Sequence, residues 1–300
     1  MESSRPTVLV AEVAVLGMAL IWGVNYSVIK YGMSFVTPMA YNTVRVAIAA
    51  VTLLAIAGLF GGAPPSRRDA VLLVLLGVLG NGFYQMLFAE GLARTRAGEA
   101  ALVVGASPAL IALFGRMKGV ELVSRRGAIG IALSMFGVGL VVLGRAHSAG
   151  VADDGSLFGD LLVLCGSVCW AIYTIYLIPF TTRVGGLWVV ALSLAGGTFV
   201  LLLFCTPAIL AQDWDLPARA WAALFYSGIG ALVVAYLLWY RGVKVLGPTR
   251  TALYANLQPL IALIVAWITL GETPTTWQVV GAGTIVGGVL LTRVPASEAS

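Results

Sequence analysis

Aromatic and amide side chains stand several turns inside otherwise apolar stretches of this sequence. Asn25 and Tyr26 follow Trp22 at helical spacing, and Tyr173 follows Trp170 in the same way. Tryptophan and tyrosine near helix ends are explained by a membrane interface, but these residues lie deeper. Buried rings of this kind need a polar partner, which a hydrated cavity supplies. We therefore expect a cavity that binds a polar head group beside an uncharged side chain. Its candidate residues are Trp22, Asn25, Tyr26, Phe83, Tyr84, Ser107, Trp170, Tyr173, Tyr236, Trp239, Tyr254, Asn256 and Gln258.

Two prolines stand at matched depth beside these candidates. Pro108 and Pro259 each follow about ten residues of apolar sequence, roughly 15 Å of helix and hence near the middle of a bilayer. Proline donates no backbone hydrogen bond, so the carbonyls of Val104 and Ala255 are expected to be free. Such a break is tolerated where the backbone faces protein or a wet cavity. One proline alone fits an ordinary kink equally well, but the matched pair favours a hinge or gate.

Arg45 is the clear deep charge, about two helical turns into the apolar stretch 38–60. An arginine at this depth marks a functional site by default, and a structural salt bridge is an equal alternative. Glu90 and Glu99, at helix ends, are the expected neighbours. We therefore interpret Arg45 and Glu90 as an orienting pair or gate.

Acidic residues are absent from the expected cavity. The nearest to membrane depth map to loops or helix ends, and no aspartate is expected to be buried; they are Glu12, Glu90, Glu99, Glu121, Asp160 and Glu272. Tyrosine ionises only near pH 10. If the chain proves to be a transporter, a cavity without a titratable group would indicate a facilitator or exchanger rather than proton-driven export.

Catalytic and metal sites are not indicated. Hydrolysis within a membrane would need a Ser–His pair, an aspartate pair or an HExxH motif at depth, whereas the one histidine, His147, falls in a predicted loop beside Asp153 and Asp154. Cys165 and Cys169 share a helix face and resemble half a metal site, but buried inert thiols are the better interpretation. We expect no enzyme, metal or cofactor.

Composition determines which elements position these residues. Of the 300 residues, 60% are hydrophobic and 10% are charged, far below the roughly 25% that a soluble surface carries. The chain is therefore expected to be an all-α polytopic membrane protein, and its net charge of +5 forms no basic groove for nucleic acid. Ten stretches are long enough to span a bilayer: 8–30, 38–60, 70–90, 98–117, 124–144, 157–180, 186–210, 218–240, 248–270 and 274–293.

An internal repeat organises the ten stretches. Nine residues of the segment 91–140 recur 151 positions later, as Pro108 does at Pro259 and Glu121 does at Glu272. Five spans per copy mean that the second copy enters from the opposite face, so the repeats are inverted around a central cavity, as in secondary transporters. We expect a first repeat over 1–144, a loop over 145–156, a second repeat over 157–293 and a tail over 294–300. The pair Gly283 and Gly287 is expected at a tight helix contact.

Lysine and arginine predict the orientation. With the N-terminus inside, twelve of them fall at inner loops or helix ends and five at outer ones. By the positive-inside rule both termini are then cytoplasmic. We expect a monomer, embedded in the lipid of the cell inner membrane.

The run from Trp22 to Lys30, WGVNYSVIK, resembles the first-helix signature of EamA-type members of the drug/metabolite transporter superfamily. The matched segments around Pro108 and Pro259, and Trp170 at the start of the second half, strengthen the resemblance. It implies ten helices in two inverted five-helix repeats that work by alternating access. Members export amino acids and other metabolites, and the mid-helix Trp and Tyr residues resemble those of some aromatic amino-acid exporters. A flippase for lipid-linked intermediates, or multidrug efflux, is the alternative on the same fold. The first-helix glutamate of small multidrug members has no equivalent at mid-span, because Glu12 lies near the inner end.

Overall fold

The computed structural model describes residues 5–119, 125–148, 154–181, 183–246, 251 and 254–292, and they form helices joined by turns. In the first half these are α1 (Arg5–Gly32), α2 (Pro38–Phe60), α3 (Arg67–Gly77), η1 (Val78–Phe83), α4 (Tyr84–Arg94), α5 (Ala97–Gly105), α6 (Ser107–Met117) and α7 (Arg125–Ser148). In the second half they are α8 (Asp154–Thr181), α9 (Gly186–Leu210), α10 (Ala218–Phe225), η2 (Tyr226–Val234), α11 (Ala235–Leu246), α13 (Gln258–Leu270) and α14 (Thr276–Thr292).

The helices form a membrane bundle. Eight of the described helical segments are long and apolar enough to cross a bilayer, and two shorter apolar helices follow, Gln258–Leu270 and Thr276–Leu291. Phe60, Leu210 and Ile268 are 76%, 80% and 74% exposed. Large apolar side chains on the outside suit lipid, because helices satisfy their own backbone in a medium without water. The predicted all-α polytopic membrane fold is confirmed.

Helix ends differ from the prediction between the halves. α7 continues to Ser148 and α8 already begins at Asp154, so residues 145–148 and 154–156 of the expected loop are helical, and His147 lies in α7. The apolar pattern marks where a helix leaves the membrane, and a helix continues past that point when polar residues tolerate it. Glu121, the repeat partner of Glu272, lies outside the described residues.

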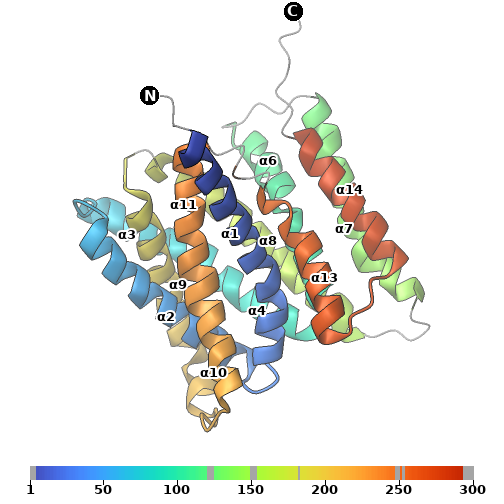
Figure 1. Ribbon diagram of the computed structural model, residues 1–300, viewed down its shortest axis with the longest axis horizontal. Coiled ribbons are helices and arrows are strands. Elements are labelled where there is room, and N and C mark those ends of the chain that lie inside the picture. The colour runs from blue at the N-terminus through green and yellow to red at the C-terminus, as the bar shows by residue number, and fades with distance from the viewer. Residues whose placement is uncertain are drawn as a thin grey trace, which may run out of the picture.

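The main helix pairs join one half of the chain to the other. α2 packs antiparallel on α9, since the sulfur atoms of Met39 and Cys205 lie 3.6 Å apart near one end and Trp188 donates to the carbonyl of Gly62 near the other. α7 packs on α14 along one edge of the bundle (Figure 1). In the same way α1 packs on α11 and α13, and α4 packs on α8.

Glycines set the contact between α7 and α14. A Cβ added at Gly288 would lie 2.5 Å from the carbonyl oxygen of Gly130, and one added at Gly281 would lie 2.9 Å from that of Gly137. The residue numbers run in opposite directions, so the two helices are antiparallel. Gly283 and Gly287 have no such neighbour within 4 Å. The predicted tight contact at those two positions is therefore wrong, because they lie on another face of α14.

Pro108 and Pro259, the two predicted hinge prolines, stand at the start of helices and do not kink continuous ones. Pro108 lies in the first turn of α6, after a break at Ala106, and Pro259 lies in the first turn of α13. Proline suits a first turn because its missing N–H has no helical partner there. Two π-helical segments, η1 and η2, interrupt the helices that run from α3 to α4 and from α10 to α11.

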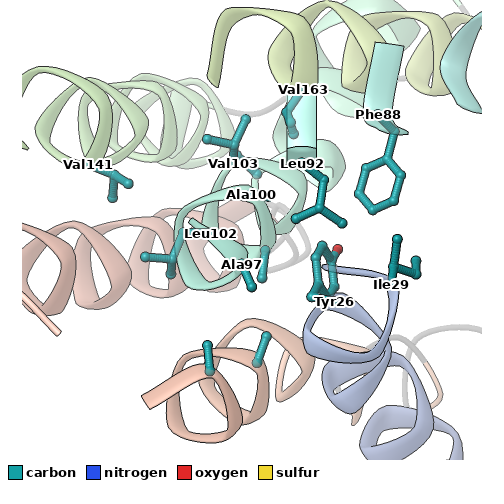
Figure 2. Packing of buried hydrophobic residues seen from close by; sticks show 14 of the residues in the cluster. Tyr26, Ile29, Phe88, Leu92, Ala97, Ala100, Leu102, Val103, Val141 and Val163 are labelled. Atoms are coloured by element: carbon teal, nitrogen blue, oxygen red, sulfur yellow. The ribbon is translucent and has the colours of Figure 1, made fainter. Parts of the chain in front are cut away.

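A buried apolar cluster joins α1, α4, α5, α7 and α8 (Figure 2). Tyr26 of α1 faces Phe88 of α4, with ring centroids 5.7 Å apart. Ala97 and Ala100 of α5 are fully buried, and their small side chains let neighbouring helices approach closely. This packing holds α1 and α5 against each other beside the site described next.

Candidate functional site

A cavity of about 550 Å³ lies among helices of both halves. Its wall draws on α1, α2, the segments from η1 to α6, α8, α9, η2, α11, α13 and α14. Eleven of the thirteen predicted binding residues line it: Trp22, Asn25, Tyr26, Tyr84, Ser107, Trp170, Tyr173, Tyr236, Trp239, Asn256 and Gln258. Pro108, Pro259 and Arg45 line it as well.

Phe83 and Tyr254 are not among the lining residues. Asn81, Tyr84, Gln85 and Phe88 face the cavity at helical spacing, so Phe83 points elsewhere and is 43% exposed. Tyr254 is half-buried, outside the lining that begins at Ala255.

Several lining residues were not predicted. Thr174 is four residues after Trp170 and Tyr240 is four after Tyr236, and this i, i+4 spacing from two candidates could have identified both. Asn81 and Gln85 also line the cavity, four residues apart on one helical segment.

The aromatic rings form two groups. Trp170 of α8 lies 5.4 Å from Tyr84 and 5.2 Å from Tyr173 between ring centroids. Trp22 of α1 lies 5.7 Å from Tyr236 and 6.0 Å from Trp239. The first helix of each half thus places a tryptophan against an aromatic ring from the other half.

Polar atoms complete the wall. Trp22 Nε1 donates to the carbonyl of Ala231 at 2.9 Å, in the π-helical segment η2, and Gln258 Nε2 donates to the hydroxyl of Tyr26 at 2.9 Å. Asn25 Oδ1 and Ser107 Oγ are buried and have no hydrogen-bond partner among the described residues. Buried polar atoms are nearly always bonded, so a ligand of this cavity has partners ready for it.

Arg45 does not form the predicted pair with Glu90. Its Nε donates to Asn42 Oδ1 at 3.0 Å and its Nη2 donates to Gln85 Oε1 at 2.7 Å. Glu90 instead forms an exposed ion pair with Arg94, one turn further along the same helix. The sequence-based pairing assumed that nearby depth meant contact, but Glu90 turns away from the cavity that Arg45 lines.

One end of the bundle is tied by a polar group that we call the Glu272 network: Lys30, Arg96, Ala97, Gly98 and Glu272. The Glu272 carboxylate accepts the backbone N–H groups of Ala97 and Gly98, at 3.1 and 3.3 Å. Lys30 Nζ and Arg96 Nε lie 3.6 and 3.9 Å from it. The network thereby joins the end of α1, the start of α5 and the turn before α14.

Two acidic residues beside this network are buried. Glu99 is 0% and Asp160 is 1% exposed, and the hydroxyl of Thr95 bonds to both carboxyl groups. Gln278 also donates to Glu99, at 2.8 Å. The expectation that no aspartate is buried was wrong, because the first turns of α5 and α8 pack together. Neither acidic residue lines the cavity.

No cluster of three or more possible metal ligands occurs among the described residues. Cys205 is buried as expected, but Cys165 is exposed on the outside of α8 and Cys169 is half-buried. Burial of all three thiols was therefore overestimated, because an apolar stretch in a membrane has a lipid-facing side as well as a buried one.

Comparison with known proteins now assigns the family. Residues 9–143 and 157–294 each match the EamA-like transporter family. The chain belongs to this family. Each half therefore holds one EamA repeat, which is the duplication seen in the sequence.

Several EamA relatives match over nearly the full length. The uncharacterized transporter YyaM of Bacillus subtilis is 27% identical, over 93% of this chain and 92% of its own. A protein of Streptantibioticus cattleyicolor named "Probable terminal-alkyne amino-acid exporter" is 26% identical, over 90% and 89%. The uncharacterized inner membrane transporter YedA of Escherichia coli is 26% identical, over 93% and 89%. One crystal structure, 19% identical, shares the fold with a TM-score of 0.64 over 94% of this chain and 96% of that one.

Proposed function

We propose that this EamA protein exports amino acids and related small metabolites across the cell inner membrane by alternating access, and that it is not an enzyme. The observation that carries the proposal is the cavity between the halves, where aromatic rings surround two buried polar atoms, Asn25 Oδ1 and Ser107 Oγ, that bond to none of the described residues. Such a wall suits a small molecule with a polar head and an uncharged side chain. The relative named as an amino-acid exporter supports the same cargo class.

The architecture that this mechanism needs is ten spans in two inverted repeats, 1–144 and 157–293, joined by 145–156 and followed by the tail 294–300. The antiparallel contacts of α7 with α14 and of α2 with α9 support it, because a twofold axis in the membrane plane brings equivalent helices together in this way. α1 begins and α14 ends at the same end of the bundle (Figure 1), which supports two cytoplasmic termini. A monomer suffices, since both halves of the site lie in one chain.

In alternating access the cavity would open at one end of the bundle and then at the other. The two ends are not closed equally tightly in this structure. The residues that line the cavity include Ala112 of α6, Leu177 of α8 and Tyr240 of α11. They lie toward the end of the bundle where these three helices finish. Arginine and lysine gather there, which favours the cytoplasmic side. The Glu272 network ties the opposite end. The breaks before Pro108 and Pro259 would absorb the movement of α5 and α13 when that end opens.

The coupling that we propose is a facilitator or exchanger. None of the described residues that line the cavity is acidic. Binding of a proton and binding of cargo would therefore not compete at one site, which is how most proton-driven exporters couple the two.

The test uses the purified protein in sealed proteoliposomes, with radiolabelled phenylalanine and leucine and with an imposed pH gradient or none. We expect flux down the amino-acid gradient and exchange against internal amino acid, with no accumulation that depends on pH. Accumulation driven by the pH gradient would refute the facilitator. Transfer of a lipid-linked sugar or efflux of cationic drugs, without amino-acid flux, would instead support the flippase or the multidrug alternative.

A further inference from the structure

Arg45 is the one charged side chain among the described residues that line the cavity. It is 1% exposed, and two neutral oxygens hold its guanidinium, Asn42 Oδ1 at 3.0 Å and Gln85 Oε1 at 2.7 Å. Asn42 Nδ2 in turn donates to the backbone carbonyl of Gln85 at 3.0 Å, so both amides are fixed by α2 and α4. The guanidinium is therefore positioned before any ligand arrives.

The charge of Arg45 is not balanced by the hydrogen bonds that it makes. Among the described residues, the ionisable groups near it are the phenols of Tyr41, Tyr84 and Tyr236, and a tyrosine is neutral at physiological pH. Arginine itself stays protonated in proteins. A cation at membrane depth is normally paired with an anion. The wall of this cavity therefore has a positive charge to offer to a ligand.

The guanidinium also has donors to offer. It carries five N–H groups in a planar fork. The two hydrogen bonds to Asn42 and Gln85 use one on Nε and one on Nη2. The remaining three lie on Nη1 and Nη2, and two parallel N–H groups of this kind match the two oxygens of a carboxylate.

We propose that Arg45 binds the carboxylate of the transported molecule, so that the cavity selects carboxylates and zwitterions over the matching amides. This deepens the proposed function and rests on it, because it takes the cavity to be the cargo site. Asn25 Oδ1, a buried acceptor without a partner in the described part of the chain, suits the ammonium group of a zwitterion. A cationic drug without a carboxylate would meet an uncompensated positive charge.

The test measures binding to the purified full-length protein by quenching of the tryptophans that line the cavity. The probes are two pairs that differ only in the carboxylate: phenylalanine with phenylalaninamide, and 3-phenylpropionate with 3-phenylpropionamide. A hydrogen-bonded charge pair corresponds to a preference on the order of 10- to 100-fold for each acid over its amide. Arg45→Gln should abolish this preference, and Arg45→Lys should keep part of it, because it keeps the charge but not the fork.

Gln85→Glu separates a binding role of Arg45 from a structural one. The change is nearly isosteric and places a carboxylate on Nη2, so the fold should keep its melting temperature while the preference for acids is lost. Gln212→Glu makes the same charge change in the turn after α9, where Gln212 bonds to Phe35 and Thr37, and should leave the preference unchanged. Acids that bind Gln85→Glu as they bind the wild type would overturn the proposal.

The remaining outcomes distinguish this proposal from the proposed function. Amino-acid flux in proteoliposomes with equal binding of acids and amides would refute the role of Arg45 and leave transport standing. A clear preference for acids that Arg45→Gln removes, without any amino-acid flux, would support the carboxylate site and refute amino-acid transport. Binding of neither acid to the wild type would refute the role of Arg45.

Discussion

Glu272→Gln should loosen the end of the bundle that the Glu272 network ties. The carboxylate of Glu272 lies at the N-terminal end of α5, where it accepts two backbone N–H groups and lies near two cations. The amide that replaces it keeps one acceptor oxygen but loses the charge. It therefore loses both ion pairs and one of the two backbone bonds, and the bond that remains becomes a neutral one.

The size of the effect follows from these contacts. A hydrogen bond to a charged group contributes about 1.5 to 3 kcal/mol and a neutral one about 1 kcal/mol. The bonds to Ala97 and Gly98 are 3.1 and 3.3 Å long, so the lower figures apply. Partly exposed ion pairs at 3.6 and 3.9 Å contribute little beside these two bonds. The expected loss is about 2 kcal/mol, or roughly a 30-fold rise in local opening.

Hydrogen exchange measured by mass spectrometry checks this, because local opening sets the exchange rate of protected amides. The peptide that contains Ala97 and Gly98 should exchange roughly 30-fold faster in Glu272→Gln. Glu90→Gln is the matched control, since it removes a carboxylate at the same end whose partner is an exposed arginine one turn away. Such a pair is worth about 0.3 to 0.5 kcal/mol, so exchange should change by about twofold at most. Equal exchange in Glu272→Gln and wild type would refute the reasoning.

Three further predictions follow from the bundle. Trp170→Ala should lower amino-acid flux about tenfold with little change in assembly, because it removes the ring between two others. Trp267→Ala, on the exposed side of α13, should leave the flux unchanged. Wild-type flux in Trp170→Ala would mean that this ring has only a packing role. Gly281→Leu should lower the free energy of unfolding by about 1 to 3 kcal/mol, and Gly283→Leu should lower it much less. Equal melting temperatures of these two variants would contradict the contact between α7 and α14. In a background without the native cysteines, one placed at Arg68 and one placed between α7 and α8 should react with impermeant maleimides from opposite faces, and labelling from the same face would exclude the inverted repeat.

The aromatic residues that line the cavity could be predicted from their distance to the ends of the apolar stretches. Trp22 and Trp170 stand too far inside their helices to be interface residues, and both line the cavity. Phe83 shows the limit of that argument. Its depth equals that of Tyr84, but the direction of a side chain depends on which face of the helix turns inward. The π-helical segment η1 changes the number of residues per turn just before Tyr84, so the regular helical pattern does not give that face.

Contacts between charged side chains could not be predicted from the sequence, for a related reason. Arg45 and Glu90 were expected to pair because they lie at similar depth and carry opposite charges. Gln85 reaches Arg45 instead, and nothing in its type distinguishes it from other amides. Asp160 was placed at an exposed helix end, but burial there depends on how α5 and α8 pack, which is a tertiary property. Which residues lie well inside an apolar stretch could thus be read from the sequence, and their neighbours on other helices could not.

The pairing of helices across the halves has a consequence for biosynthesis. α2, α4 and α7 find their main partners in α9, α8 and α14, which the ribosome completes later. At a synthesis rate of about 5 to 20 residues per second, roughly 7 to 30 s pass between the completion of α7 and the completion of α14. During that time its glycine face is open to lipid and to the translocation machinery. Neither half is then expected to assemble alone, and two halves expressed as separate chains should accumulate only when they are made together.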